Sequence, residues 1–306
     1  MYDLIGDIHG HAKELRELLH KLGYVPDAAG TYRHPAGRRV IFVGDFIDRG
    51  PAIRETLQIV RGMVDGGAAL AVMGNHEYNA LAFWTQDPAG GYLRPHLPIH
   101  ILQHLGTIKE FGTKELFAEW QDYLAWFLRL PLFLDLPGLR VVHACWEPDS
   151  IEYLRAQLDG ACLTPEFLVA ASRRGSEEFK HVEVTLKGRE IPVPGGQHFF
   201  DKDNNRRDMV RVSWWLDPAQ ATYGTYFLPP IEELLDAPVD VASLSDSSHY
   251  KEETPVFFGH YWMSGKPVVL TPYSVCLDYS VAKAGELVAY QWNGERELTS
   301  NGLVSV

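Results

Sequence analysis

The first eighty residues alternate between short apolar runs and amphipathic stretches. Three apolar runs each end at a Gly, and they are Tyr2–Ile5, Val40–Val43 and Ala68–Met73. Runs of this kind, bounded by turn residues, indicate buried parallel strands. Helical periodicity follows over Lys13–Leu22 and Ile53–Met63, with a weaker pattern from Glu77. The pattern therefore predicts three successive strand–turn–helix units in an α/β sheet.

The three turns carry a dense set of polar residues. Their sequences are GDIHG at 6–10, GDFIDRG at 44–50 and GNHE at 74–77. Because the carboxyl ends of neighbouring parallel strands share one crevice, we expect the side chains of these turns to converge there. They are Asp7, His9, Asp45, Asp48, Arg49, Asn75, His76 and Glu77. Carboxylate, amide and imidazole ligands at this density suit two divalent metal ions, and an Arg beside them suits a phosphate.

The pattern changes after the third turn. Helical periodicity predicts helices over Ile99–Leu105 and Lys114–Leu128, the second with a Trp- and Phe-rich face that indicates burial. The segment 131–144 predicts a hairpin turned at Pro137-Gly138, with its second strand ending at His143.

Residues 147 to about 250 are predicted to form an insertion into this fold. A helix is expected near Ser150–Leu158, and alternating apolar residues predict a hairpin over 182–193. A second strand–turn–strand pattern follows, with DKDNN at 201–205 as the turn and Met209–Trp215 as the far strand.

The tail of the chain returns to short segments typical of strands. They are Val256–Gly259, Pro267–Leu270, Ser274–Asp278 and Glu286–Trp292. We expect them to form the second sheet of a two-sheet αββα sandwich, an α/β fold with mixed sheets and helices outside both. Residues 1–306 would then form a single domain that carries the insertion.

Composition and charge limit the classes of function. With 46% apolar residues the chain can bury a substantial core, and no apolar run is long enough to span a membrane. Cys145, Cys162 and Cys276 are too widely spaced for a disulfide framework or a zinc ribbon, so a cytoplasmic protein is expected. A formal net charge of −12 argues against extended nucleic acid as substrate, although a local basic pocket stays compatible with it.

Two downstream motifs complete a family signature. They are VVHA at 141–144 and FFGH at 257–260. Together with the three turns, in this order, they resemble the phosphoprotein phosphatase branch of the calcineurin-like metallophosphoesterases. That branch includes the Ser/Thr protein phosphatases and the bacterial symmetrical diadenosine tetraphosphatases. The resemblance is close through residue 80 and at these two motifs, and thin elsewhere.

The resemblance implies a centre of two divalent metal ions. Its ligands would be Asp7, His9, Asp45, Asn75, His143 and His260, with Asp45 bridging the two ions. The ions would lie about 3.5–4 Å apart and share a bridging hydroxide that attacks phosphorus. Mn is expected to be the metal, with Fe, Zn or Co as alternatives.

The resemblance also implies three catalytic residues. Arg49 would hold the oxygens of the substrate phosphate, since its planar guanidinium can donate to two oxygens at once. His76 would protonate the leaving group, and Asp48 would orient its imidazole. Glu77 is expected to hold its loop rather than take part in chemistry.

The sequence departs from the family pattern at three places. His260 is followed by Tyr261 and Trp262, so the second His that many metallophosphoesterases outside this branch carry is absent. Cys145 replaces the usual Gly, and a small buried residue is the favoured interpretation. The second phosphate-binding Arg of the family has no counterpart, because no Arg occurs from 212 to 265. Nearby candidates to replace it are Arg206, Arg207 and Arg211, although an ordinary surface residue is the favoured interpretation of each.

Other groups of residues give weaker indications of sites. His96, His100 and His104 have the i, i+4, i+8 spacing that could stack imidazoles on a helix, but nearby prolines favour a loop with incidental histidines. The acidic run at 201–205 starts like a calcium-binding loop and lacks its required Gly and Glu.

An aromatic cluster in the insertion could stack a nucleobase. It consists of Trp214, Trp215, Tyr223, Tyr226 and Phe227. Core packing of the insertion is the favoured interpretation.

The sequence leaves the substrate open among several classes. A phosphomonoesterase acting on small phosphorylated molecules or phosphoproteins would share every motif residue with a diadenosine tetraphosphatase-like nucleotide hydrolase. A binding protein that kept the fold and lost catalysis is a third alternative, but it would be expected to show a damaged ligand set. Since the motifs are complete, the sequence favours a metal-dependent phosphatase.

Overall fold

Two β-sheets pack face to face in the computed structural model, which describes residues 1–196, 198–200 and 206–306. The first sheet has the strand order β15-β16-β1-β4-β5, with β17 paired to β16. Its strands are β1 (Tyr2–Ile5), β4 (Arg39–Phe42), β5 (Ala69–Ala71), β15 (Asp278–Tyr279), β16 (Glu286–Trp292) and β17 (Leu303–Ser305). Strands β1, β4 and β5 run parallel, so the turns that follow them open at the same edge.

The second sheet has the order β14-β13-β7-β6. It consists of β6 (Phe133–Leu136), β7 (Leu139–Val142), β13 (Val256–Phe258) and β14 (Ser274–Cys276). Strand β13 runs parallel to β7 and β14, and β6 pairs with β7 in the predicted hairpin. Between the sheets lies a core to which Leu4, Ile41, Val141, Phe257 and Val288 contribute buried side chains.

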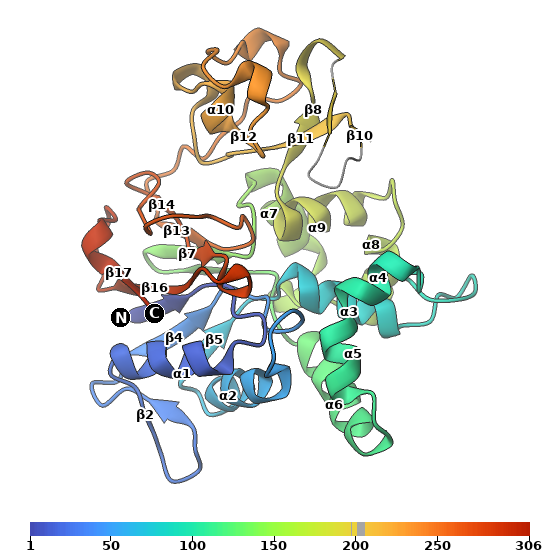
Figure 1. The fold of residues 1–306 in the computed structure, drawn as a ribbon, viewed down its shortest axis with the longest axis vertical. Coiled ribbons are helices and arrows are strands. Elements are labelled where there is room, and N and C mark those ends of the chain that lie inside the picture. Colours follow the sequence, from blue (N-terminus) through green and yellow to red (C-terminus); the bar gives the residue numbers. More distant parts are fainter. Residues whose placement is uncertain (197, 201–205) are drawn as a thin grey trace.

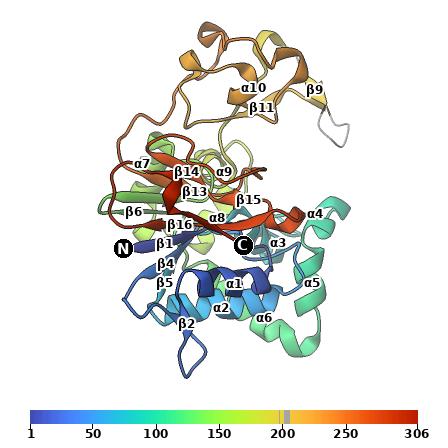
Figure 2. The same ribbon diagram turned by 60° about the vertical axis from the view of Figure 1, so that its left-hand side comes forward.

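Helices cover the outer faces of both sheets, as the two ribbon views show (Figures 1 and 2). On the first sheet lie α1 (Ala12–Lys21) and α2 (Ile53–Asp65), followed by α3 (Asn75–Trp84), α4 (Pro98–Gln103), α5 (Leu105–Phe111) and α6 (Lys114–Phe127). On the second sheet lie α7 (Pro148–Gln157), α8 (Pro165–Ala171) and α9 (Glu177–Lys187). The predicted αββα sandwich is confirmed.

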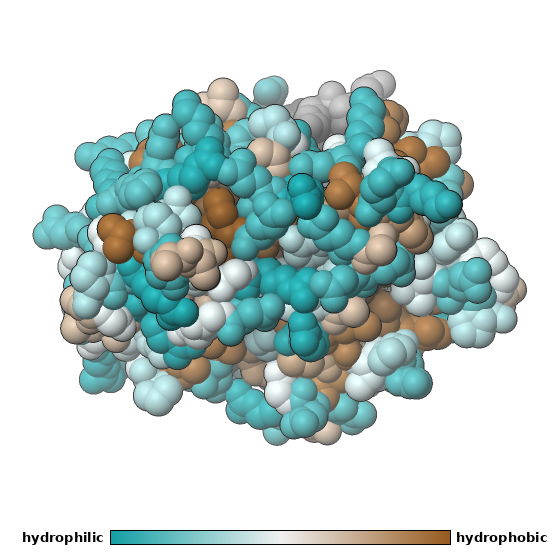
Figure 3. Space-filling model, turned by 90° about the horizontal axis from the view of Figure 1, so that it is seen from below, coloured by the Kyte–Doolittle hydropathy of each residue, from teal (hydrophilic) through white to brown (hydrophobic). Residues whose placement is uncertain are grey.

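The helices of the first sheet are amphipathic. In α1, Leu15, Leu18 and Leu19 are buried against the sheet, while the remaining positions are mostly polar. The face seen from below is accordingly mostly hydrophilic, with hydrophobic side chains in small groups (Figure 3). Among the described residues, no helix combines the length and apolar character needed to cross a membrane.

The predicted hairpin over 182–193 is wrong in its first half. Residues Glu177–Lys187 form α9, and only β8 (Glu190–Pro192) is a strand. The Ser176 side chain caps α9 by accepting a hydrogen bond from the Phe179 N–H, and Val182 and Leu186 are buried four residues apart. Over so short a stretch, the apolar residues fit both the alternation of a strand and the spacing of a helix. The Ser176 cap favours the helix.

The predicted tail is partly wrong as well. Strands β13 and β14 join the second sheet, but β15, β16 and β17 extend the first. The segment Pro267–Leu270 forms no strand. Pro267 cannot donate a ladder hydrogen bond, and the N–H of Val268 donates instead to the hydroxyl of Tyr279.

A small lobe built from residues after 188 stands apart from the sandwich (Figures 1 and 2). Its three-stranded sheet consists of β8, β11 (Met209–Val212) and β12 (Phe227–Leu228). The lobe also contains the short helix α10 (Tyr223–Tyr226) and the strand pair β9 (Phe199–Phe200) and β10 (Arg206–Arg207). In the main body, two further short strands pair with each other, β2 (Val25–Pro26) and β3 (Tyr32–Arg33). The predicted turn at 201–205, with Asp201, Asp203 and Asn205, lies outside the described residues.

The aromatic cluster of the insertion is buried, which confirms the packing interpretation. Tyr223, Tyr226 and Phe227 belong to the core of the small lobe. Trp214 and Trp215 pack into the main core instead. Cys145, Cys162 and Cys276 are free thiols, and Cys145 is buried as expected.

Candidate metal centre

The three Gly-led turns meet in one place, and two of the glycines are required there. A Cβ on Gly44, whose φ is 101°, would lie 2.5 Å from the backbone nitrogen of Gly74. A Cβ on Gly74 would lie 2.2 Å from Oδ1 of Asp45. These contacts leave no room for a side chain, so the second and third turns can approach closely only as Gly.

Several site residues have left-handed backbone conformations that a side chain disfavours. The φ angles are 46° at His9, 53° at Asp45, 67° at Asp48, 66° at Arg49 and 72° at His260. Backbone strain of this kind concentrates at functional sites, where surrounding structure holds it in place.

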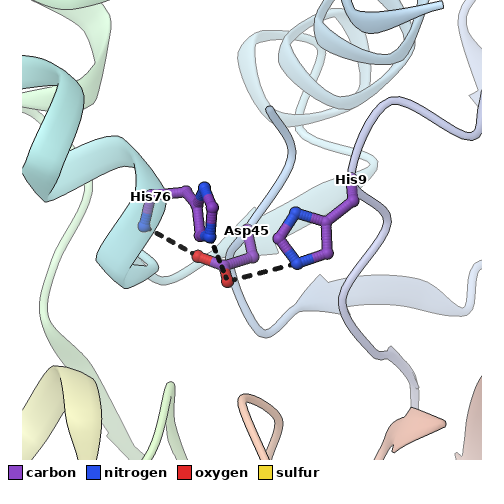
Figure 4. A group of neighbouring side chains, drawn as sticks. All are labelled: His9, Asp45 and His76. Atoms are coloured by element: carbon purple, nitrogen blue, oxygen red, sulfur yellow. Dashed lines mark hydrogen bonds and ion pairs between the residues drawn. The ribbon is translucent and has the colours of Figure 1, made fainter. Parts of the chain in front are cut away.

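Asp45 lies at the centre of the cluster, with histidines approaching both oxygens. Its Oδ2 is 3.5 Å from Nε2 of His9 and 4.0 Å from Nε2 of His76. Figure 4 shows the two rings around the carboxylate, His9 from the turn after β1 and His76 from α3. The backbone N–H of His76 also donates to Oδ1 of Asp45 at 2.9 Å.

A second group meets the other side of Asp45. Nε2 of His143, at the end of β7, is 3.5 Å from Oδ1 of Asp45. Oδ1 of Asn75 lies 3.1 Å from Nε2 of His143 and 2.7 Å from Nδ1 of His260. Two overlapping sets of donor atoms therefore share Asp45: one with His9 and His76, the other with His143 and His260.

Three buried polar atoms of these residues lack a hydrogen-bond partner within the described structure. They are Oδ1 of Asp7, Nε2 of His9 and Nε2 of His260. A buried polar atom without a partner is costly, and a bound cation would supply one. Gly259 lies against this place, since a Cβ there would be 1.9 Å from Oδ1 of Asp7.

The second nitrogens of two histidines are fixed by backbone carbonyls. Nδ1 of His9 bonds to the carbonyl of Ile47 at 2.9 Å, and Nδ1 of His143 bonds to that of Val43 at 2.8 Å. When Nδ1–H donates to a carbonyl, Nε2 presents its lone pair to the site, which is the arrangement of a metal ligand.

Burial and neighbouring charges shift the acidities of the cluster strongly, and in both directions. Burial raises the pKa of Asp7 well above its usual range, and neighbouring Asp278 raises it further. Burial, with His76 nearby, lowers the pKa of His9 to about 3. Burial and the charge of Arg211 hold the pKa of His260 well below its usual range. Burial lowers the pKa of His143, but the charge of Asp45 outweighs it and raises that pKa to about 10. His9 and His260 are therefore ready to ligate as neutral imidazoles, whereas a cation would displace a proton from His143 and from Asp7.

Asp48 and His76 form a close pair next to the cluster. Oδ2 of Asp48 is 2.6 Å from Nδ1 of His76. Burial lowers the pKa of His76, but Asp45 and Asp48 outweigh it and the net shift is upward. The pair has the geometry of a carboxylate that orients an imidazole.

Two residues that sequence reasoning did not assign also contact Asp48. Nδ1 of His104 and Oγ1 of Thr107 lie 2.8 Å and 2.6 Å from Oδ1 of Asp48. The interpretation of His104 as incidental is therefore wrong. That interpretation suits His96 better, because the His96 ring stacks on the ring of Phe83 at a centroid distance of 3.9 Å. The spacing of the histidines was the one feature of the sequence that could have drawn attention to His104, and no feature pointed to Thr107.

Arg49 is exposed beside the cluster and packs on an aromatic ring. Its guanidinium carbon lies 4.3 Å from the ring centroid of Trp262, which Nζ of Lys283 also approaches to 3.9 Å. Asp278, likewise unassigned from the sequence, accepts a hydrogen bond from the backbone N–H of Trp262 at 2.7 Å. The Trp262 ring thus holds the arginine at the edge of the site.

A large open cavity of about 1940 Å³ lies over the cluster. Asp48, Arg49, Asn75 and His76 line its floor, and residues from the small lobe line the opposite side. The candidate substitutes Arg206, Arg207 and Arg211 all line this cavity. Nη2 of Arg211 lies 3.6 Å from Oε1 of Glu190.

This fold and cluster define a metallophosphoesterase. The model of the calcineurin-like phosphoesterase family matches residues 2–217, and the chain belongs to that family.

Two curated relatives match about half of this chain, and a third matches most of it. An asymmetrical bis(5'-nucleosyl)-tetraphosphatase PrpE from Oceanobacillus iheyensis is 33% identical over 142 residues, which are 46% of this chain and 54% of that protein. Its counterpart from Bacillus subtilis is 44% identical over 165 residues, 52% of this chain and 63% of that protein. A symmetrical bis(5'-nucleosyl)-tetraphosphatase from Janthinobacterium is 24% identical over 93% of this chain and 90% of that protein. The chain thus spans less than two thirds of the PrpE relatives it matches.

Solved structures of similar fold include two phosphatases. A crystal structure of a putative diadenosine tetraphosphatase has a TM-score of 0.46 at 17% identity and covers 100% of this chain and 92% of its own. A protein serine/threonine phosphatase from Saccharomyces cerevisiae has a TM-score of 0.45 at 14% identity. The match covers 100% of this chain and 78% of that one.

Proposed function

We propose that this protein is a two-metal phosphohydrolase whose centre is organised by Asp45. One observation carries the proposal: two sets of buried donors share that carboxylate, and three buried polar atoms around it lack a hydrogen-bond partner in the described structure. Such atoms are what a closely spaced pair of cations would satisfy. The chain would be one domain, with about 147–250 inserted.

The residues divide between two positions in this proposal. Asp7, His9 and Asp45 would hold one divalent ion, and Asp45, Asn75, His143 and His260 would hold the other. Both would be Mn, with Fe, Zn or Co as alternatives, because oxygen and imidazole ligands suit all of these metals. When bound, the ions activate water as the nucleophile and polarise the phosphoryl oxygens.

Two of the other site residues act on the substrate directly, and a third supports one of them. Arg49 borders the cavity, so its guanidinium can donate to two oxygens of the transferring phosphoryl group. His76 also lines the cavity and would protonate the departing oxygen through Nε2, since Nδ1 is engaged by Asp48. Asp48 orients the ring and balances its charge.

For the substrate we propose phosphate monoesters, either small phosphorylated molecules or phosphoproteins. A second candidate, a dinucleoside polyphosphate, is favoured by the names of the bis(5'-nucleosyl)-tetraphosphatase relatives. Several Arg and Lys side chains also line the cavity, among them Arg94, Arg174 and Lys187, and they suit a substrate with more than one phosphate.

A substrate panel with the metal-reconstituted protein tests the proposal. The panel contains an aryl phosphate, a bis-aryl phosphate, diadenosine tetraphosphate and a phosphopeptide. We expect Mn-dependent release of phosphate from the monoesters and suppression by a chelator. Preferred cleavage of diadenosine tetraphosphate would select the second candidate, and no metal-dependent cleavage of any phosphate would overturn the proposal.

A further inference from the structure

Both oxygens of Asp48 are occupied by side chains from different parts of the chain. Nδ1 of His76 lies 2.6 Å from Oδ2, while Nδ1 of His104 and Oγ1 of Thr107 lie 2.8 Å and 2.6 Å from Oδ1. His104 is 5% exposed and lies at the junction of α4 and α5. Residues of α5 and of its junction with α4 thus contact the Asp48 carboxylate, which in turn contacts the proposed acid His76.

The proton positions on His104 follow from its second contact. Nε1 of Trp84 lies 3.1 Å from Nε2 of His104, and an indole N–H can only donate. Nε2 of His104 therefore accepts, and the single ring proton of the neutral imidazole is on Nδ1. That proton is donated to Oδ1 of Asp48.

The hydrogen bond from His104 determines which oxygen of Asp48 is left for His76. With His104 and Thr107 donating to Oδ1, the oxygen that remains for His76 is Oδ2. Although burial raises it, the hydrogen bonds from His104 and His76 hold the pKa of Asp48 well below its usual range. The carboxylate is therefore ionised and fixed in rotation, and Nε2 of His76 is left 4.0 Å from Oδ2 of Asp45.

We propose that His104 is a positioning residue for the acid His76, acting through Asp48. The role rests on the proposed function, because it presumes that His76 protonates a leaving group. His104 needs no contact with substrate, since its Nδ1–H fixes the carboxylate that fixes the imidazole. The rival account is that His104 only packs the α4–α5 junction, where its ring lies near those of Phe83 and Trp120.

Two variants separate hydrogen bonding from packing. His104→Phe fills the space without a donor, whereas His104→Asn keeps an N–H near the position of Nδ1. If His104 positions the acid, His104→Phe should lower kcat on an alkyl phosphate by about 10- to 100-fold, the usual cost of losing such a supporting partner. The loss on 4-nitrophenyl phosphate should be distinctly smaller, KM should stay near that of the parent, and His104→Asn should recover most of the activity.

Controls keep folding and metal content apart from positioning. His96→Phe changes a neighbouring histidine that bonds only to the carbonyl of Phe83 in the described structure, and it should behave like the parent. Thermal unfolding and metal analysis of each variant show whether the site is intact. In the metal-free protein, nitrogen-15 NMR should find His104 protonated on Nδ1.

The outcomes distinguish this inference from the proposed function. Equal losses on both substrates, parent-like activity in His104→Phe, or His104 protonated on Nε2 would overturn the positioning role alone. A parent protein without metal-dependent phosphatase activity would overturn the proposed function, and the role of His104 with it.

Discussion

The carboxylate of Glu77 accepts a hydrogen bond from the backbone N–H of Asp45 at 2.8 Å. The same carboxylate accepts from Phe46 at 2.8 Å and from Gly74 at 3.0 Å. Glu77 is fully buried, so it joins the second turn to the start of α3 without facing the cavity. The strained turn that presents Asp45 is therefore held by a residue of the third motif.

Replacing Glu77 should damage both stability and metal binding. In Glu77→Gln one oxygen becomes an amide donor opposite backbone donors, so buried N–H groups lose their partner. The expected cost is about 1–3 kcal/mol in the free energy of unfolding, with weaker metal binding. Denaturant unfolding and metal titration measure the two effects.

Glu110→Gln is the matched control. Glu110 also accepts from two backbone N–H groups, those of Ile53 and Arg54. It should lose stability while keeping the metal affinity of the parent. If Glu77→Gln kept full metal affinity as well, Glu77 would not be needed to hold the Asp45 turn.

Loss of either downstream histidine should weaken one metal position. His143 and His260 both lie beside Asn75 on the same side of Asp45. His143→Ala and His260→Ala should each reduce bound metal from two equivalents toward one, as measured by elemental analysis after dialysis. His34→Ala, which changes a ring packed against Tyr24 and outside both groups of donors, should leave the metal content unchanged. Two retained equivalents in both site variants would contradict the assignment.

Removing the guanidinium of Arg49 should impair phosphate binding. Arg49→Ala should raise KM and lower kcat, because an Arg on the transferring phosphoryl group acts in the ground state and the transition state. Inorganic phosphate should inhibit this variant less than the parent. Trp262→Leu should also raise KM and lower kcat, but by less, since it removes only the ring under the guanidinium. Arg16→Ala, which breaks an exposed ion pair with Glu55, is the control. Equal phosphate inhibition of parent and Arg49→Ala would exclude Arg49 from the site.

The loss of His76 should depend on the leaving group. Protonation matters most for a poor leaving group such as an alkoxide, and general acid catalysis contributes about 100- to 10,000-fold. His76→Asn should lose about that much on alkyl phosphates and distinctly less on 4-nitrophenyl phosphate, with metal content near that of the parent. Asp48→Asn should follow the same pattern more mildly. Equal losses on both substrates with one metal missing would show instead that His76 is a ligand, which its place in the His9–Asp45 group would allow.

The sequence predicted the first half of the site because its signals are local. Each turn combines an apolar strand with a Gly that the packing requires, as at Gly44 and Gly74. Those turns follow parallel neighbours in one sheet, so convergence could be inferred without knowing the rest of the fold.

The remaining features depend on contacts between distant segments. His104 reaches Asp48 across 56 residues, through a junction of α4 and α5 that no periodicity indicates. Helix α9 was mistaken for a strand because its buried Val182 and Leu186 also fit an alternating pattern. Strand β16 pairs with β1, the other end of the chain, so its place in the first sheet could not be inferred from local sequence.

The central claim is that Asp45 is shared by two metal ions, and calorimetric titration of Mn²⁺ into the metal-free protein tests it most directly. The parent should bind two equivalents. Asp45→Asn should lose affinity for both, because the bridging carboxylate serves each position, and turnover should fall by several orders of magnitude. Two full equivalents bound with parent affinity by Asp45→Asn, together with normal activity, would contradict the shared centre.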